Sequence, residues 1–178
     1  MPLYARFPRL TTEHYRGRGL YFVTICCAER RAVFGDLVLG RETVALLVGI
    51  AAQHSFLLHS FCLMPDHLHF LAEGAVDTSD LVKFVNVFKQ ISAFRFRRTN
   101  SNALWQSRFY DHILRKAERI ERVVSYIWMN PVRKGLCAEP RDYPLSGPQV
   151  AGWRSCAAIE MTWIPPWKNT QKKSQEEV

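Results

Sequence analysis

Two histidines one residue apart, His67 and His69, lie inside the apolar run LMPDHLHFLAE. Alternate residues of a β-strand point to the same face, so both imidazoles would project together while Leu68 faces the other side. Each buried imidazole nitrogen needs a partner, which makes two adjacent core histidines an unusual arrangement. The pattern is compatible with a metal site, with a pair of satisfied core histidines, or with an exposed pair on a solvated face.

A second set of reactive side chains lies on the predicted helix RIERVVSYIWMNP, residues 119–131. Tyr126 and Asn130 are four residues apart and share a helical face, along which Arg122 and Arg119 precede them. Arginines near a tyrosine would stabilise its phenolate, and they also match the geometry of a phosphate. Each of these residues taken alone is more typical of a solvated basic face.

The elements that must position these residues follow from periodicity. Aromatic and β-branched runs predict strands over 21–27, 56–64, 67–73 and 104–114. Apolar residues at helical spacing predict helices over 42–53, 80–98 and 116–130. The pair Pro65-Asp66 predicts a hairpin between the second and third strands. The order of elements predicts an α+β fold, with an antiparallel sheet whose helices pack on one face.

Two helical stripes are predicted to face the core. The stripe of the long helix consists of Leu81, Phe84, Val85, Phe88, Ile91 and Phe94. The stripe of the last helix consists of Ile120, Val123, Val124 and Ile127.

Charge and composition narrow the class of protein. The 178 residues carry a formal net charge of +8, which favours a polyanionic partner. Five cysteines without a CxxC spacing are typical of reduced cytosolic thiols. No apolar run approaches the roughly 20 residues that span a bilayer, so we expect a cytoplasmic protein without a membrane partner.

Basic residues are mixed with Tyr4, Phe7 and Tyr15 near the N-terminus, a combination that suits single-stranded nucleic acid. The predicted DNA-binding residues of this arm are Arg6, Arg9, Arg16 and Arg18, and those of the long helix include Lys83 and Lys89.

Five stretches in this order make the chain resemble the REP-associated tyrosine transposases, which act at repeated extragenic palindromes and belong to the single-tyrosine (IS200-like) HUH transposases. The stretches are YFVTICCAERRAVFG, MPDHLHFL, LWQSRFYDHILR, YIWMNPVRKGL and DYPLSG, and the resemblance covers roughly residues 6–147. It implies a palm-like HUH endonuclease fold, with the histidine pair on a central strand and the nucleophile on the last helix.

The resemblance also implies roles for single residues. His67, His69 and Asn130 match the metal ligands, and Tyr126 matches the nucleophile. The implied reaction cleaves single-stranded DNA near small hairpins and leaves a 5′-phosphotyrosine and a free 3′-OH. The family favours Mg²⁺ or Mn²⁺, whereas imidazole ligands by themselves would favour zinc, manganese or nickel.

Several assignments stay open. Asp66 would either orient a ligand histidine or fill a turn position. Tyr110 is the rival nucleophile and otherwise a core or DNA-stacking residue. Trp105-Gln106 and Tyr143 are expected to be structural.

We expect one domain over residues 1–150, with a basic N-terminal arm, and an extension over 151–178 that is partly disordered. The protein would act as a monomer or homodimer near the bacterial nucleoid. Two rival functions are a catalytically silent binder of single-stranded DNA or RNA hairpins and a metal-dependent RNA-processing enzyme that uses His67 or His69 as a base.

Overall fold

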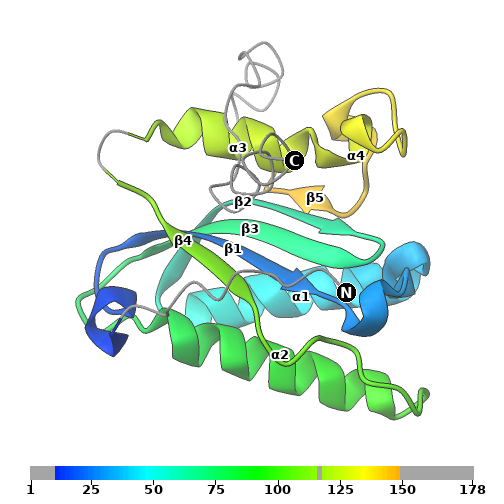
Figure 1. Cartoon of the computed structure of the whole chain (residues 1–178), viewed down its shortest axis with the longest axis horizontal. Coiled ribbons are helices and arrows are strands. Elements are labelled where there is room, and N and C mark those ends of the chain that lie inside the picture. The colour runs from blue at the N-terminus through cyan, green and yellow to red at the C-terminus, as the bar shows by residue number, and fades with distance from the viewer. Residues whose placement is uncertain (1–10, 116–117, 149–178) are drawn as a thin grey trace, which may run out of the picture.

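The structure is a computed structural model of the chain, and it describes residues 11–115 and 118–148. Within these residues, five strands form one antiparallel sheet in the order β4-β1-β3-β2-β5 (Figure 1). The strands are β1 Leu20–Cys26, β2 Phe56–Met64, β3 His67–Gly74, β4 Tyr110–Ile113 and β5 Ser146–Gly147. The helices are α1 Leu37–Gln53, α2 Leu81–Arg97, α3 Ile120–Trp128 and α4 Asn130–Arg133, with short 3-10 turns at Thr12–Tyr15, Ala28–Arg30, Val33–Gly35 and Pro140–Asp142. The predicted α+β fold is confirmed; Arg6, Arg9 and the segment 151–178 lie outside the described residues.

Helices cover both faces of the sheet, whereas the sequence pattern predicted helices on one face. Helices α1 and α2 lie below the sheet in Figure 1 and α3 lies above it. Phe70 of β3 contacts Phe84 of α2, while the adjacent His69, which points the other way, contacts Tyr126 of α3. The physical reason is the near-continuous burial of β1 and β3, because a strand buried on both sides needs a cover on each.

Two aspartates set the starts of the long helices. Asp36 caps α1 by accepting hydrogen bonds from the backbone N–H groups of Val38 and Leu39, so α1 begins five residues before the predicted position. Asp80 caps α2 by accepting from the N–H of Lys83, close to the predicted start. Both caps lie directly before apolar periodic segments.

The core stripe of α2 departs from the predicted one in its second half. Phe94 is 68% exposed, and the stripe continues from Phe88 through Ser92 and Phe96 instead. The cause is Trp105, whose Nε1 donates to Ser92 Oγ at 2.8 Å and whose ring lies 5.9 Å from that of Phe88. Trp105 is therefore structural, as predicted.

The segment that was predicted as one long strand over 104–114 pairs as a regular strand only over Tyr110–Ile113. Its first half, which bends at Leu104 and Ser107, is anchored by other contacts. Lys89 Nζ donates to the carbonyls of Gln106 and Ser107, each at 2.8 Å. The backbone N–H of Ala28 donates to the carbonyl of Leu104, and the backbones of Cys27 and Trp105 form an isolated antiparallel β-bridge.

The last predicted helix is divided into α3 and α4 at Met129. Pro131 lacks an N–H group and so cannot donate to the Ile127 carbonyl one turn earlier. Asn130 supplies a side-chain donor there, since its Nδ2 lies 3.0 Å from the Tyr126 carbonyl and 3.4 Å from that of Ile127. Val123, Val124 and Ile127 are buried as predicted, whereas Ile120 is exposed.

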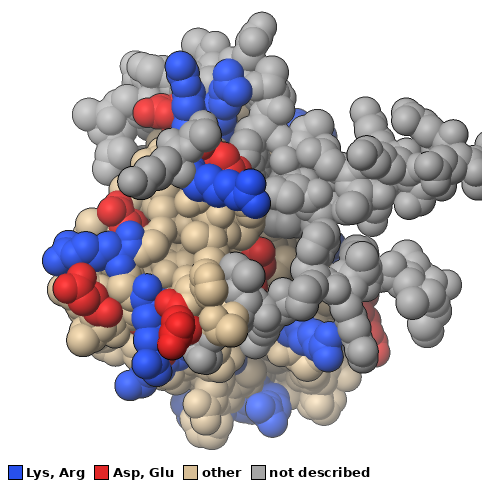
Figure 2. All heavy atoms as spheres, turned by 60° about the vertical axis from the view of Figure 1, so that its left-hand side comes forward, with Lys and Arg blue, Asp and Glu red and all other residues tan. Residues whose placement is uncertain are grey.

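Charged side chains are dispersed on the face that Figure 2 draws. Among the described residues there, Lys and Arg lie mostly beside Asp and Glu, around a broad uncharged area. Arg16 pairs with Asp80, and Arg18 pairs with Asp77. Both arginines precede the Leu20 end of β1, whereas the β1 residue that pairs with His67 is Cys26, at the opposite end. Within the described ranges, no helix combines the length and the apolar character that a bilayer crossing requires.

Candidate active site

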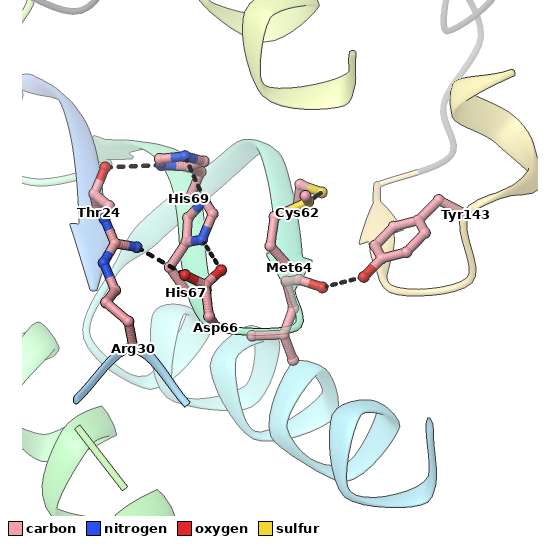
Figure 3. Close-up of polar contacts among 9 residues, drawn as sticks. Thr24, Arg30, Cys62, Met64, Asp66, His67, His69 and Tyr143 are labelled. Carbon is pink, nitrogen blue, oxygen red and sulfur yellow. Dashed lines mark hydrogen bonds and ion pairs between the residues drawn. The ribbon is translucent and has the colours of Figure 1, made fainter. Parts of the chain in front are cut away.

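The two histidines of β3 converge on one position. Strand alternation places both rings on the α3 face, and His67 Nε2 lies 3.0 Å from His69 Nε2 (Figure 3). The ring centroids are 4.5 Å apart and the ring planes are almost perpendicular, at 78°. Both rings therefore direct the same type of nitrogen toward a shared point, which is how a pair of imidazole ligands approaches a cation.

The opposite nitrogen of each ring is anchored by a separate side chain. His67 Nδ1 lies 2.5 Å from Asp66 Oδ1, and His69 Nδ1 lies 2.7 Å from Thr24 Oγ1. Thr24 is the register partner of His69 on β1, and Asp66 occupies the turn of the β2–β3 hairpin. Outer partners of this kind fix the orientation of a ligating imidazole.

The Asp66 carboxylate selects one tautomer of His67. The hydrogen bond from His67 lowers the pKa of Asp66, and the charges of His67 and Arg30 lower it further against the opposing effect of burial. An ionised carboxylate can only accept, so His67 Nδ1 carries the donated proton. In the neutral imidazole, Nε2 then holds the lone pair that a cation requires.

A cation at this point would need a ligand of another type besides the two imidazoles. Among the described residues, no group of three or more His, Cys, Asp or Glu side chains is placed to hold a metal ion. Cys26 and Cys62 are the register partners of His67 and His69, but burial raises the pKa of both thiols, that of Cys62 to about 12. Protonated thiols are poor metal ligands.

Tyr126 reaches the histidine pair from α3. Its side chain is 7% exposed, and its ring centroid lies 6.0 Å from those of His69 and Phe22. The rival Tyr110 lies on the same face, but on β4, where it pairs with Thr24 two strands away from β3. The described contacts therefore bring Tyr126, from a helix, to the ring of His69.

Asn130 and Arg133 surround the backbone of Tyr126. Asn130 is buried at the start of α4, with its Nδ2 on the Tyr126 carbonyl. An Arg133 Nη atom donates to the same carbonyl at 2.6 Å, and its guanidinium carbon lies 4.4 Å from the Tyr126 ring centroid. Sequence reasoning missed Arg133, although its spacing of seven residues from Tyr126 equals two helical turns.

Arg6 and Arg9 lie outside the described residues, and the other predicted basic residues lie just before β1, on α2 and at the start of α3. Arg119 and Arg122 are exposed at the first turn of α3, while the guanidinium on the Tyr126 ring belongs to Arg133. Lys83 is exposed on α2, behind the sheet, and Lys89 donates to backbone carbonyls. Arg30, which the sequence analysis also missed, donates to Asp66 Oδ2 at 3.2 Å.

Tyr143 has the structural role that was predicted for it. Its hydroxyl donates to the carbonyl of Leu63 at 2.9 Å, and burial raises its pKa above the usual value. This bond ties the segment after α4 to β2, two residues from the hairpin turn that carries Asp66.

Comparisons with known proteins give a family match and named relatives. A family model described as "Transposase IS200 like" matches residues 18–130. An Escherichia coli REP-associated tyrosine transposase is 26% identical over 139 residues, covering 75% of this chain and 79% of that protein. A Haemophilus influenzae protein provisionally named a REP-associated tyrosine transposase is 26% identical over 140 residues, covering 72% and 78%.

A solved structure is similar over most of both chains. It is the structure of a REP-associated tyrosine transposase bound to a REP hairpin, with a TM-score of 0.65 and 19% identity. The likeness covers 92% of this chain and 93% of that chain, and at this identity it concerns the fold.

Proposed function

The chain belongs to the family of IS200-like transposases, which are DNA strand transferases, and from this premise we propose that it cleaves and rejoins single-stranded DNA beside REP-type hairpins through a 5′-phosphotyrosine intermediate. The observation that carries the proposal is the placement of Tyr126 against His69, whose Nε2 lies 3.0 Å from that of His67. The hairpin partner is proposed because a structure with this fold is that of a relative bound to a REP hairpin.

His67, His69 and the amide oxygen of Asn130 would hold a divalent ion, Mg²⁺ or Mn²⁺. The two converging Nε2 atoms fit such an ion, because Asp66 and Thr24 already hold the rings by their other nitrogens. When bound, the ion would supply positive charge to a non-bridging oxygen of the scissile phosphate. Asp66 would therefore orient His67 toward the ion, and Thr24 would orient His69.

Tyr126 would perform the covalent step. Its hydroxyl oxygen forms a bond to phosphorus while the bond from phosphorus to the 3′ oxygen breaks. The phenol loses a proton and the departing 3′ oxygen takes one up, so the step releases no net proton. The phosphotyrosine bond conserves the energy of the broken diester, so that a 3′-OH can later attack it and rejoin the strands.

Two end labels on a hairpin oligonucleotide test this proposal. With Mn²⁺ or Mg²⁺ present, we expect a protein–DNA adduct on denaturing gels that retains a 3′ label, while a 5′ label leaves on a shorter fragment. The adduct should disappear in Tyr126→Phe and in His67→Ala, and it should persist in Tyr110→Phe. An adduct that survives in Tyr126→Phe, or one that retains the 5′ label, contradicts the proposal.

Two other outcomes identify the rival functions. Hairpin binding without an adduct under either metal would indicate a catalytically silent binder. Cleavage of RNA without an adduct would indicate an RNA-processing enzyme in which His67 or His69 acts as the base.

A further inference from the structure

We propose that Arg133 is a positioning residue that restricts rotation of the Tyr126 ring and so sets the direction in which its hydroxyl meets DNA. This inference rests on the proposed role of Tyr126 as the nucleophile. It assigns a task to an arginine that neither binds the metal nor lies in the predicted phosphate-binding set.

Arg133 contacts Tyr126 in two independent ways. One guanidinium nitrogen donates to the main-chain carbonyl of Tyr126 at 2.6 Å. The guanidinium carbon also lies 4.4 Å from the centroid of the phenol ring, within the range of a cation–π contact. A single planar group thus connects the backbone and the side chain of the same residue, which restricts rotation of the ring relative to its own helix.

The break between α3 and α4 makes this contact available. Helix α3 ends at Trp128, so the Tyr126 carbonyl belongs to its last turn, where carbonyls lack the N–H partners of a continuing helix. Asn130 Nδ2 and Arg133 both donate to the Tyr126 carbonyl. In an unbroken helix the Tyr126 carbonyl would accept from the N–H of residue 130, and Arg133 would not be needed as its donor.

The phenol ring also meets two aromatic side chains of the sheet. Phe22 and His69 each meet the ring edge to face, with interplanar angles of 68° and 63°. Arg133 adds a polar, charged contact to these two aromatic ones. In-line attack depends on the direction of the hydroxyl, and misplacing a reacting group by about 1 Å can cost about 100-fold in rate.

A guanidinium suits this place better than an ammonium. Arg133 as a whole is exposed, but partial desolvation of its guanidinium lowers its pKa while the nearby Tyr126 acts in the opposite direction, and an arginine remains charged at neutral pH. Its flat shape can lie on a ring while an edge N–H reaches a carbonyl, whereas a lysine ammonium is a point charge on a flexible stem. A lysine at position 133 should therefore contact either the carbonyl or the ring of Tyr126, but not both at once.

Single-turnover adduct formation at saturating DNA tests the inference. Arg133→Met should slow adduct formation about 10- to 100-fold, while the Kd for the hairpin changes less than about threefold. Arg133→Lys should recover part of the rate. Lys134→Met, a substitution of the adjacent exposed residue, is the matched control and should react like the wild type. An unchanged rate in Arg133→Met, or a loss confined to DNA affinity, overturns the inference.

A readout that needs no catalysis separates this inference from the proposed function. In protein labelled with 3-fluorotyrosine, the ¹⁹F signal of Tyr126 is assigned by its absence in Tyr126→Phe. Arg133→Met should shift this signal, and Arg133→Lys should return it part of the way. If the wild type forms no adduct, the proposed function fails, while the ¹⁹F signal still decides whether Arg133 positions the ring. A signal unmoved in Arg133→Met rejects positioning whatever the adduct assay shows.

Discussion

His67 Nε2 and His69 Nε2 lie 3.0 Å apart, yet the two rings are anchored by chemically different partners. His67 is held by the carboxylate of Asp66, which fixes its tautomer. His69 is held by the hydroxyl of Thr24, which can donate or accept. Without a cation, one Nε2 must carry a proton to donate to the other. Thr24 lets His69 be that donor, and it equally allows the other tautomer, whose Nε2 lone pair the proposed cation would need.

Replacing Thr24 should weaken metal binding without unfolding the protein. In Thr24→Val the shape of the side chain is kept but the anchor of His69 Nδ1 is lost, and we expect the Kd for Mn²⁺ to rise about 10- to 100-fold. Isothermal titration calorimetry measures this change. Thr43→Val is the control, since Thr43 is equally buried but donates to the Leu39 carbonyl within α1. Equal effects of the two substitutions would argue against the anchoring role.

Metal binding should raise the melting temperature only when both imidazoles are present. A ligand at 100 times its Kd stabilises the folded state by about 2.7 kcal/mol, so Mn²⁺ should increase the Tm of the wild type. His67→Ala and His69→Ala should each abolish this increase, which differential scanning calorimetry with and without Mn²⁺ would detect. A variant that keeps the full increase would place the ion elsewhere.

Lys89 should contribute to stability rather than to DNA affinity. Its ammonium donates to two carbonyls ahead of β4, so Lys89→Met would leave both without this donor. We expect a loss of about 1–3 kcal/mol in the free energy of unfolding by urea, with hairpin affinity unchanged. Lys83→Met, at an exposed position of α2, should change stability by less than about 0.5 kcal/mol. A large drop in DNA affinity for Lys89→Met would restore the original prediction of a DNA contact.

Alkaline pH should destabilise the protein through its buried thiols. Burial raises the pKa of Cys27 and of Cys62 to about 12, above the usual 9.0. Above pH 9 these thiols lose their protons in the unfolded chain but keep them in the folded protein. The contribution of the two thiols to the free energy of unfolding is therefore complete below pH 9 and is lost as the pH rises toward 12. Each thiol can account for up to about 1.4 kcal/mol per pH unit in this window. Urea unfolding at pH 8, 9.5 and 10.5 should show the decline, with a shallower slope in Cys62→Ala.

The parts of the site that sequence reasoning found are those governed by local periodicity. That His67 and His69 lie on the same face of β3 follows from alternation within one strand. That Asn130 lies one turn beyond Tyr126 follows from helical spacing. The contact of Thr24 with His69 could not be predicted, because it depends on the register between β1 and β3, which one sequence does not fix. Arg133 was missed because a helix break lets it turn back, and the prediction stopped the helix at Asn130.

Long-range contacts also explain features outside the site that local periodicity does not reveal. Phe94 has the right spacing for the core, but Trp105 of a distant segment covers the other side of α2. Lys89 is a typical surface cation by sequence, and only the path of residues 106–107 gives it carbonyl partners. The second helical layer could have been inferred from the nearly unbroken apolar run of β1, LYFVTIC, which alternation alone does not explain.

The contact between Tyr126 and His69 also bears on reaction order. Both residues belong to the same polypeptide, and the chain from β3 to α3 is continuous between them. If Tyr126 is the nucleophile and His67 and His69 hold the ion, as proposed, these groups meet within one molecule and keep their mutual concentration however far the protein is diluted. The specific rate of adduct formation on saturating DNA would then be independent of protein concentration, so that a few molecules in a cell would each be as competent as they are in a concentrated solution.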